Sequence, residues 1–127
     1  MSDEIRLVRA SERELPAASQ TPGMAREQAF AEDGRWVGFV RVEPGMVSGW
    51  HHHGDHESYL FVVSGRSRFE FGPGGSQVVE AEAGDFLHVP ARLVHRESNP
   101  GDDEQTLVVF RVGHGPPLVN VDGPDAM

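Results

Sequence analysis

Short segments in which apolar and polar residues alternate recur along the chain, separated by turn-forming residues. Residues 35–43 (RWVGFVRVE) have this pattern and stop at Pro44-Gly45, and residues 58–63 (SYLFVV) have it again. Further segments of this kind lie at residues 68–71, 77–82, 86–89, 94–97 and 106–112. Strands of four to nine residues between glycine and proline turns predict an all-β barrel or sandwich.

The two ends of the chain are less regular than its middle. Near the N-terminus we expect an edge strand at residues 5–9, a loop at 14–23 and one or two helical turns at 25–31. Near the C-terminus, residues 118–121 could add a last short strand.

We expect one domain over residues 1–127, because no internal repeat or linker divides the chain. Its core barrel should span about residues 35–113, with an N-terminal arm at 1–34 and a C-terminal arm at 114–127. Because exposed strand edges need covering, extended arms favour pairing with a second copy. A homodimer is therefore expected.

Composition removes several classes of protein. The chain has 20 acidic and 11 basic residues and a net charge of −9, which disfavours binding to nucleic acid. No segment approaches the ~18 consecutive apolar residues of a membrane span. The charged N-terminus also lacks the apolar stretch of a signal peptide, so we expect a cytoplasmic protein that is not bound to a membrane. The absence of cysteine excludes disulfides and thiolate metal sites.

Histidines supply the candidate chemistry. Four of them, His51, His52, His53 and His56, lie within six residues, and His95 follows about forty residues later. In a strand, residues i and i+2 point to the same face, so His51 and His53 can both face inward while His52 faces out. With His95 they could hold one metal ion, and neutral imidazole suits iron, nickel, copper and zinc. The alternative is a polar loop without a metal.

The spacing around these histidines resembles the two motifs of the cupin superfamily. The first motif has a glycine, five residues, His-x-His and a closing glycine, which correspond here to Gly45, His51, His53 and Gly65. The second has a glycine, five residues, a proline, a histidine and an asparagine, which correspond to Gly84, Pro90, His95 and Asn99. Arg92 stands where the second motif has a glycine. The resemblance implies a double-stranded β-helix (jelly-roll) barrel and a divalent metal, iron, manganese, nickel or zinc, held by His51, His53 and His95.

The family's glutamate ligand has two candidate positions. Glu57 follows His53 after three residues, as the motif requires, but it lies one residue too far from Gly65. Counting back from Gly65 places Ser58 at the glutamate position. A regular strand would turn Ser58 inward and Glu57 outward, whereas a β-bulge would turn Glu57 inward. Glu57 is thus a candidate metal ligand and general base, with water as the alternative and His56 as a further substitute.

We expect the other charged residues on the predicted strands to lie mainly at the surface. An inward arginine could bind a carboxylate substrate, although for each of them an outward ion pair is the stronger expectation: Arg41, Arg68, Arg96 and Arg111. The same surface role is expected of Glu43, Glu70 and Glu97. His88 is expected at the surface or in the core, with the cavity as its alternative.

The resemblance implies a site with coordination positions open to a small-molecule substrate or ligand. Our first hypothesis is a metal-dependent oxidoreductase of the dioxygenase type that acts on a small organic molecule. The alternatives are a non-catalytic cupin that binds or senses a small ligand, and a cupin isomerase or cyclase. The family's fold does not choose among them.

Overall fold

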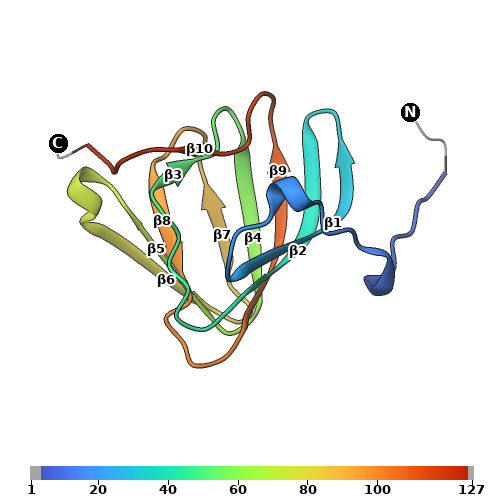
Figure 1. Ribbon diagram of the computed structural model, residues 1–127, viewed down its shortest axis with the longest axis horizontal. Coiled ribbons are helices and arrows are strands. Elements are labelled where there is room, and N and C mark those ends of the chain that lie inside the picture. Colours follow the sequence, from blue (N-terminus) through green and yellow to red (C-terminus); the bar gives the residue numbers. More distant parts are fainter. Residues whose placement is uncertain (1–3, 126–127) are drawn as a thin grey trace.

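The structure, a computed structural model, describes residues 4–125. In this range ten strands form two five-stranded antiparallel sheets that face each other (Figure 1). The first sheet contains, in spatial order, β1 (Met24–Glu32), β2 (Arg35–Val42), β9 (Gln105–Val112), β4 (Glu57–Ser64) and β7 (Phe86–Val89). The second contains β10 (Val119–Asn120), β3 (His51–His52), β8 (His95–Ser98), β5 (Arg66–Phe71) and β6 (Gln77–Glu82).

The alternating sequence pattern produces this arrangement because successive side chains of a strand point to opposite faces of its sheet. In β4, Ser58, Leu60 and Val62 are buried between the sheets, while Tyr59 is exposed. Apolar side chains from both sheets fill the core: Met24, Val40, Val42, Leu60, Val62, Phe69, Ala81, Val89, Leu107 and Val109. The all-β prediction is confirmed, and the double-stranded β-helix follows from the comparisons reported below.

Two predictions near the N-terminus are wrong. Residues 25–31 are not helical but belong to β1, which pairs with β2 and has a bulge between Gln28 and Phe30. Pairing along a whole neighbouring strand outweighs the weak local helical tendency of this segment. Residues 5–9 form no strand, and a short 3₁₀ helix (Ala10–Glu12) follows them. The strands of the barrel therefore run from Met24 to Asn120, beyond the expected limits of 35–113.

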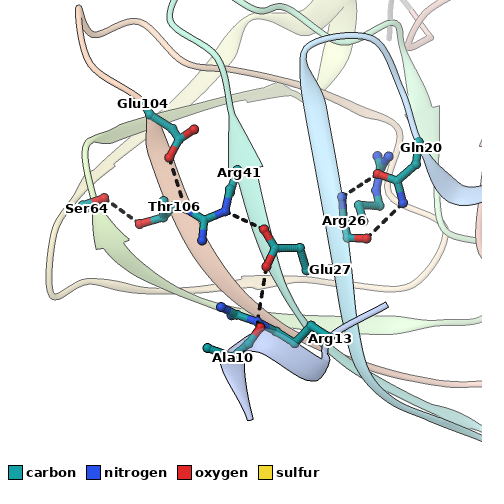
Figure 2. Close-up of polar contacts among 9 residues, drawn as sticks. All are labelled: Ala10, Arg13, Gln20, Arg26, Glu27, Arg41, Ser64, Glu104 and Thr106. Atoms are coloured by element: carbon teal, nitrogen blue, oxygen red, sulfur yellow. Dashed lines mark hydrogen bonds and ion pairs between the residues drawn. The ribbon is translucent and has the colours of Figure 1, made fainter. Parts of the chain in front are cut away.

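Ion pairs tie the N-terminal arm to the outer side of β1 (Figure 2). Arg13 lies 3.2 Å from the carboxylate of Glu27, which also binds Arg41 at 2.5 Å. Arg41 in turn reaches Glu104 at 3.3 Å. Arg41 therefore faces outward, as expected, and links β2 to its surroundings. A second 3₁₀ helix (Ala17–Ser19) and a loop then lead the chain into β1.

Arg92 keeps the backbone conformation that the second motif normally assigns to glycine. Its φ is 62°, in the left-handed region that non-glycine residues rarely adopt. Its N–H donates to the carbonyl of Gly54 at 2.9 Å, and its guanidinium pairs with Asp55. The turn at Arg92 thus has the left-handed conformation of the motif's glycine, and contacts to the loop after β3 stabilise it.

Asn99, the last residue of the second motif, joins the two sheets. Its buried amide donates to the carbonyls of Val42 (3.0 Å) and Asp103 (2.8 Å) and accepts from the N–H of Gly101 (3.0 Å). We expect Asn99→Ala to lower the free energy of unfolding by about 3 kcal/mol, because it leaves buried backbone groups without partners. Denaturant unfolding measures this loss. Asn120→Ala, at an exposed strand position, is the control and should change stability by less than about 0.5 kcal/mol.

Candidate metal centre

The structure brings His51, His53 and His95 together at one end of the barrel. His51 on β3 is directly opposite His95 on β8, and His53 follows in the loop after β3. Their ring centroids lie 4.4 to 5.0 Å apart. All three are buried, with exposed fractions of 4%, 8% and 1%. A cluster of buried imidazoles needs polar partners, because burying a polar group without one is costly.

Each imidazole is oriented by a backbone carbonyl on its Nδ1 side. His51 Nδ1 lies 2.9 Å from the carbonyl of Gly49, His53 Nδ1 lies 2.8 Å from that of Pro117, and His95 Nδ1 lies 2.9 Å from that of Leu93. This bonding favours the tautomer with hydrogen on Nδ1, which leaves the lone pair of Nε2 free to bind a metal.

The free nitrogens converge. The ligand atoms of the three histidines lie within 4.8 Å of one another. Nε2 of His51 and Nε2 of His95 are buried and have no hydrogen-bond partner among the described residues. Two unpartnered buried nitrogens that face a third imidazole are what a metal site without its ion presents. The residues present therefore fit a divalent transition metal.

Burial keeps His53 and His95 in the neutral form that binds a metal. Burial, helped by the nearby guanidinium of Arg111, lowers the pKa of His53 to about 2. Burial also lowers the pKa of His95. Both side chains are neutral at neutral pH, and neutral imidazole is the metal-binding state.

Glu57 lies outside this cluster, on the outer face of the first sheet. β4 pairs with β9 without a bulge from Glu57 to Val62, so Ser58 faces the barrel and Glu57 faces away. The Glu57 carboxylate accepts hydrogen bonds from Nε2 of His88, at 2.8 Å, and from the backbone N–H of Ala91. These bonds, that from Ala91 first, lower the pKa of Glu57. The structure thus gives no support to Glu57 as a ligand or general base.

Two other candidate histidines also lie outside the cluster. His88 stacks on Tyr59 on the outer face, with ring centroids 4.9 Å apart. His56, the further substitute for the glutamate, has its Nε2 3.0 Å from the carbonyl of Gly115. Neither ring contributes to the metal centre.

A different carboxylate, Glu97, stands beside the histidines. It follows His95 by two residues on β8 and so points to the same side of the strand. Its Oε1 lies 3.9 Å from Nε2 of His51, and the side chain is only 16% exposed. In the described part of the chain, no other carboxylate lies within 4 Å of any of the three histidines. Its parity with His95 was visible in the sequence, although a surface role was expected.

Two arginines face the same interior. Arg111 on β9 and Arg26 on β1 line a small inner chamber of about 30 Å³ together with His53, Ser58 and Glu97. Both also line a wider outer pocket of about 410 Å³, which Trp36 and Pro117 border. An inward arginine was considered for Arg111. Arg26 was missed, because no strand was expected in its segment. Arg68 and Arg96 instead pair with Glu80 and Glu70.

Comparison with known proteins agrees with this geometry. The pattern of the cupin domain family matches residues 38–111, which is more than half of the chain. No curated protein sequence matches it. No helix among residues 4–125 is long and apolar enough to cross a membrane.

Solved structures with the same fold include two from different bacteria. An uncharacterised conserved protein with a double-stranded β-helix domain from Klebsiella pneumoniae is 19% identical, with a TM-score of 0.70 over 93% of this chain and 98% of that one. Oxalate decarboxylase from Bacillus subtilis, a protein with Mn(II) centres, is 22% identical, with a TM-score of 0.68 over 81% of this chain. The matched region spans only 29% of the decarboxylase. The family pattern, the barrel and the three histidines lead to one conclusion: this chain belongs to the cupin family.

Proposed function

We propose that this cupin is a metal-dependent oxidoreductase of the dioxygenase type that acts on a small organic molecule. The observation that carries the proposal is the convergence of three buried imidazoles, with the Nε2 atoms of His51 and His95 unpartnered among the described residues. His51, His53 and His95 would hold the ion, which would supply Lewis-acid and redox chemistry to a small substrate when bound.

The residues of the chain have separate roles in this proposal. His51, His53 and His95 hold the ion, and the carbonyls on their Nδ1 atoms fix the rings. Glu97, within 4 Å of His51 Nε2, accepts a proton from a substrate or a water in the chamber. It thereby takes the role of general base for which Glu57 was the candidate in the sequence.

The metal in this proposal is iron or manganese. Imidazole alone suits several transition metals, but a nearby carboxylate shifts the preference toward manganese. The Mn(II) centres of the similarly folded oxalate decarboxylase are consistent with that choice. Nickel and zinc are the alternatives, and reconstitution of the metal-free protein with each metal in turn distinguishes them from iron and manganese.

Glu97 favours an enzyme over a module that only binds a ligand. A carboxylate that is only 16% exposed beside the three histidines gives the site a proton acceptor, which ligand storage does not need. An isomerase or cyclase would also use this base. Consumption of oxygen separates these enzymes, because the dioxygenase-type oxidoreductase consumes oxygen and an isomerase or cyclase does not.

Oxygen uptake tests this function. Protein reconstituted with Fe(II) or Mn(II) is mixed with diketones, flavonols, thiols and small organic acids in an oxygen electrode. We expect uptake with at least one of these classes, and incorporation of label from ¹⁸O₂ into its product. Turnover of a substrate without oxygen uptake would replace the oxidoreductase with an isomerase or cyclase.

We also propose that the outer face of the first sheet pairs with a second copy of the chain. The outward side chains of β9 carry no charge, and Tyr59 and Phe86 extend this apolar surface, with Phe86 80% exposed. Because each chain has a net charge of −9, two copies can approach closely only at a face with few acidic groups.

Light scattering of the protein in solution should therefore give the mass of a dimer. Phe86→Ser should shift it to a monomer, because it removes an exposed aromatic anchor from the surface. Leu118→Ser, at an exposed apolar position near β10, is the control and should remain dimeric. A wild-type monomer would contradict the proposal.

A further inference from the structure

The interior of this barrel contains two partly buried guanidinium groups that have no carboxylate within ion-pair distance. Charges that are drawn even partly out of water are normally paired, because an unpaired charge away from water is expensive. Neither Arg26 nor Arg111 forms an ion pair with any residue between 4 and 125. We propose that these two arginines bind the carboxylate of a small organic acid, which is the substrate or ligand of the pocket. The inference rests on the proposed function, since it assigns the ligand class of the same site.

The guanidinium of Arg111 makes few contacts with the rest of the protein and is therefore available to bind a ligand. The one hydrogen bond of its guanidinium is a long contact of 3.5 Å from Nε to the hydroxyl of Ser58. Its planar group also lies over the ring of Trp36, 5.6 Å from the centroid. The terminal nitrogens are left without acceptors among the described residues. A guanidinium in this state offers the two parallel N–H groups that match a carboxylate.

Hydrogen bonds to the segment that precedes β1 hold the side chain of Arg26 in position. Its Nη1 donates to the carbonyl of Ser19 at 2.8 Å and to the hydroxyl of Thr21 at 2.9 Å. The amide of Gln20 brackets its backbone, accepting from the N–H at 2.7 Å and donating to the carbonyl at 2.9 Å (Figure 2). These contacts fix Arg26, and its Nη2 has no hydrogen-bond acceptor among residues 4–125. A positioned donor of this kind lowers the entropic cost of binding a ligand.

The charges of the inner chamber favour a single carboxylate. Arg26 and Arg111 contribute two positive charges and Glu97 one negative charge, so the chamber keeps one positive charge. Arg26 and Glu97 both act electrostatically on Arg111, and burial with the repulsion from Arg26 lowers its pKa. Without a metal ion, one monoanion neutralises this set, whereas a phosphate dianion would leave an excess negative charge beside Glu97. A bound divalent ion would add to the attraction for an anion.

The two cavities indicate how such an acid would lie. Arg26 and Arg111 line both the outer pocket of about 410 Å³ and the inner chamber of about 30 Å³. An outer pocket of this size holds a small organic molecule, and the inner chamber has room for about one water-sized group. A carboxylate at the arginines would thus place the adjoining carbon near Glu97 and the histidines.

Calorimetric titration of the full chain with matched acids and amides tests this assignment. The probes are propionate and propionamide, benzoate and benzamide, and inorganic phosphate. At least one acid should bind about tenfold or more tightly than its amide, because only the acid forms charge-assisted bonds. In Arg111→Met this preference should fall to about one. Arg96→Met, which removes an arginine paired with Glu70 on the outside, should keep it.

A thermal melt separates a binding role from a structural one. Methionine has no charge and a long flexible side chain, so it fills much of the space of Arg111 and removes the cost of holding a partly buried charge. We expect Arg111→Met to melt at or above the wild-type temperature. A strongly destabilised Arg111→Met would show that the arginine serves the fold, and would contradict the inference.

Metal content, measured on the same samples, keeps this inference separate from the proposed function. Equal binding of acid and amide, no binding of either acid at millimolar concentration, or tighter binding of phosphate would overturn the carboxylate site. If that happened in protein that binds a metal through the histidines, the metal centre would stand. A clear acid preference in protein that binds no metal would support the carboxylate site and contradict the metal-dependent function.

Discussion

Replacing His53 with alanine is expected to abolish stoichiometric binding of a divalent metal. The substitution removes one of three nitrogens and leaves two buried imidazoles that cannot close the site. Losing even an outer partner of a metal ligand typically costs about 10–100-fold in affinity, and loss of the ligand itself should exceed that. Competition with a chromophoric chelator measures the change.

Melting temperature gives a second measurement of the same effect. An ion that binds only the folded chain at about 1,000 times its dissociation constant stabilises the chain by about 4 kcal/mol. The wild-type melting temperature should therefore rise when metal is added, and that of His53→Ala should not. His52→Ala is the matched control, because His52 contacts the N–H of Gly54 and is not part of the cluster. Metal affinity that survives in His53→Ala, or that His52→Ala loses as well, would show that the three histidines are not the site.

Exchanging Glu97 for glutamine should disable turnover, while the same exchange at Glu57 should not. A positioned general base typically contributes about 10²–10⁴-fold to a rate, and glutamine keeps the shape of the side chain but cannot accept the proton. Glu97 stands 3.9 Å from Nε2 of His51. We expect Glu97→Gln to slow oxygen uptake by that factor and to weaken metal binding by about tenfold.

Glu57→Gln is the comparison that tells the two carboxylates apart. Its carboxylate bonds to His88 and to the backbone of Ala91 on the outer face, so its loss should cost about 1 kcal/mol of stability and leave turnover and metal affinity unchanged. The opposite pattern, with Glu57→Gln inactive and Glu97→Gln active, would return the role of base to the position that the spacing to His53 suggests.

Much of the fold and the three histidines of the candidate metal centre could be predicted from the sequence, because both depend on local regularities. The alternation in β4 fixes which side chains are buried, and the spacing of His51 and His53 places both on one face. The same parity correctly gave the alternative in which Ser58 faces the barrel and Glu57 faces away. The open question was a bulge, and β4 pairs with β9 in regular register from Glu57 to Val62, which turns Glu57 outward.

The rest of the pocket could not be predicted, because it depends on long-range pairing. The segment around Arg26 has no clear strand pattern of its own, and its pairing with β2 places the guanidinium toward the interior. Arg111 and Arg96 look alike in sequence, but one faces the chamber and the other pairs with Glu70. Glu97 is the intermediate case. Its parity with His95 was visible, but parity alone does not separate a pocket wall from a buried ion pair.

Elemental analysis of the wild-type protein, purified after growth in medium that supplies iron, manganese, nickel and zinc, tests the metal centre most directly. The geometry predicts about one equivalent of a divalent transition metal per chain, since three converging imidazoles form one site. A chelator should remove the metal, and adding back the same ion should restore it. Protein that contains none of these metals, and takes none up when each is added in turn, would contradict the assignment of His51, His53 and His95 as a metal centre.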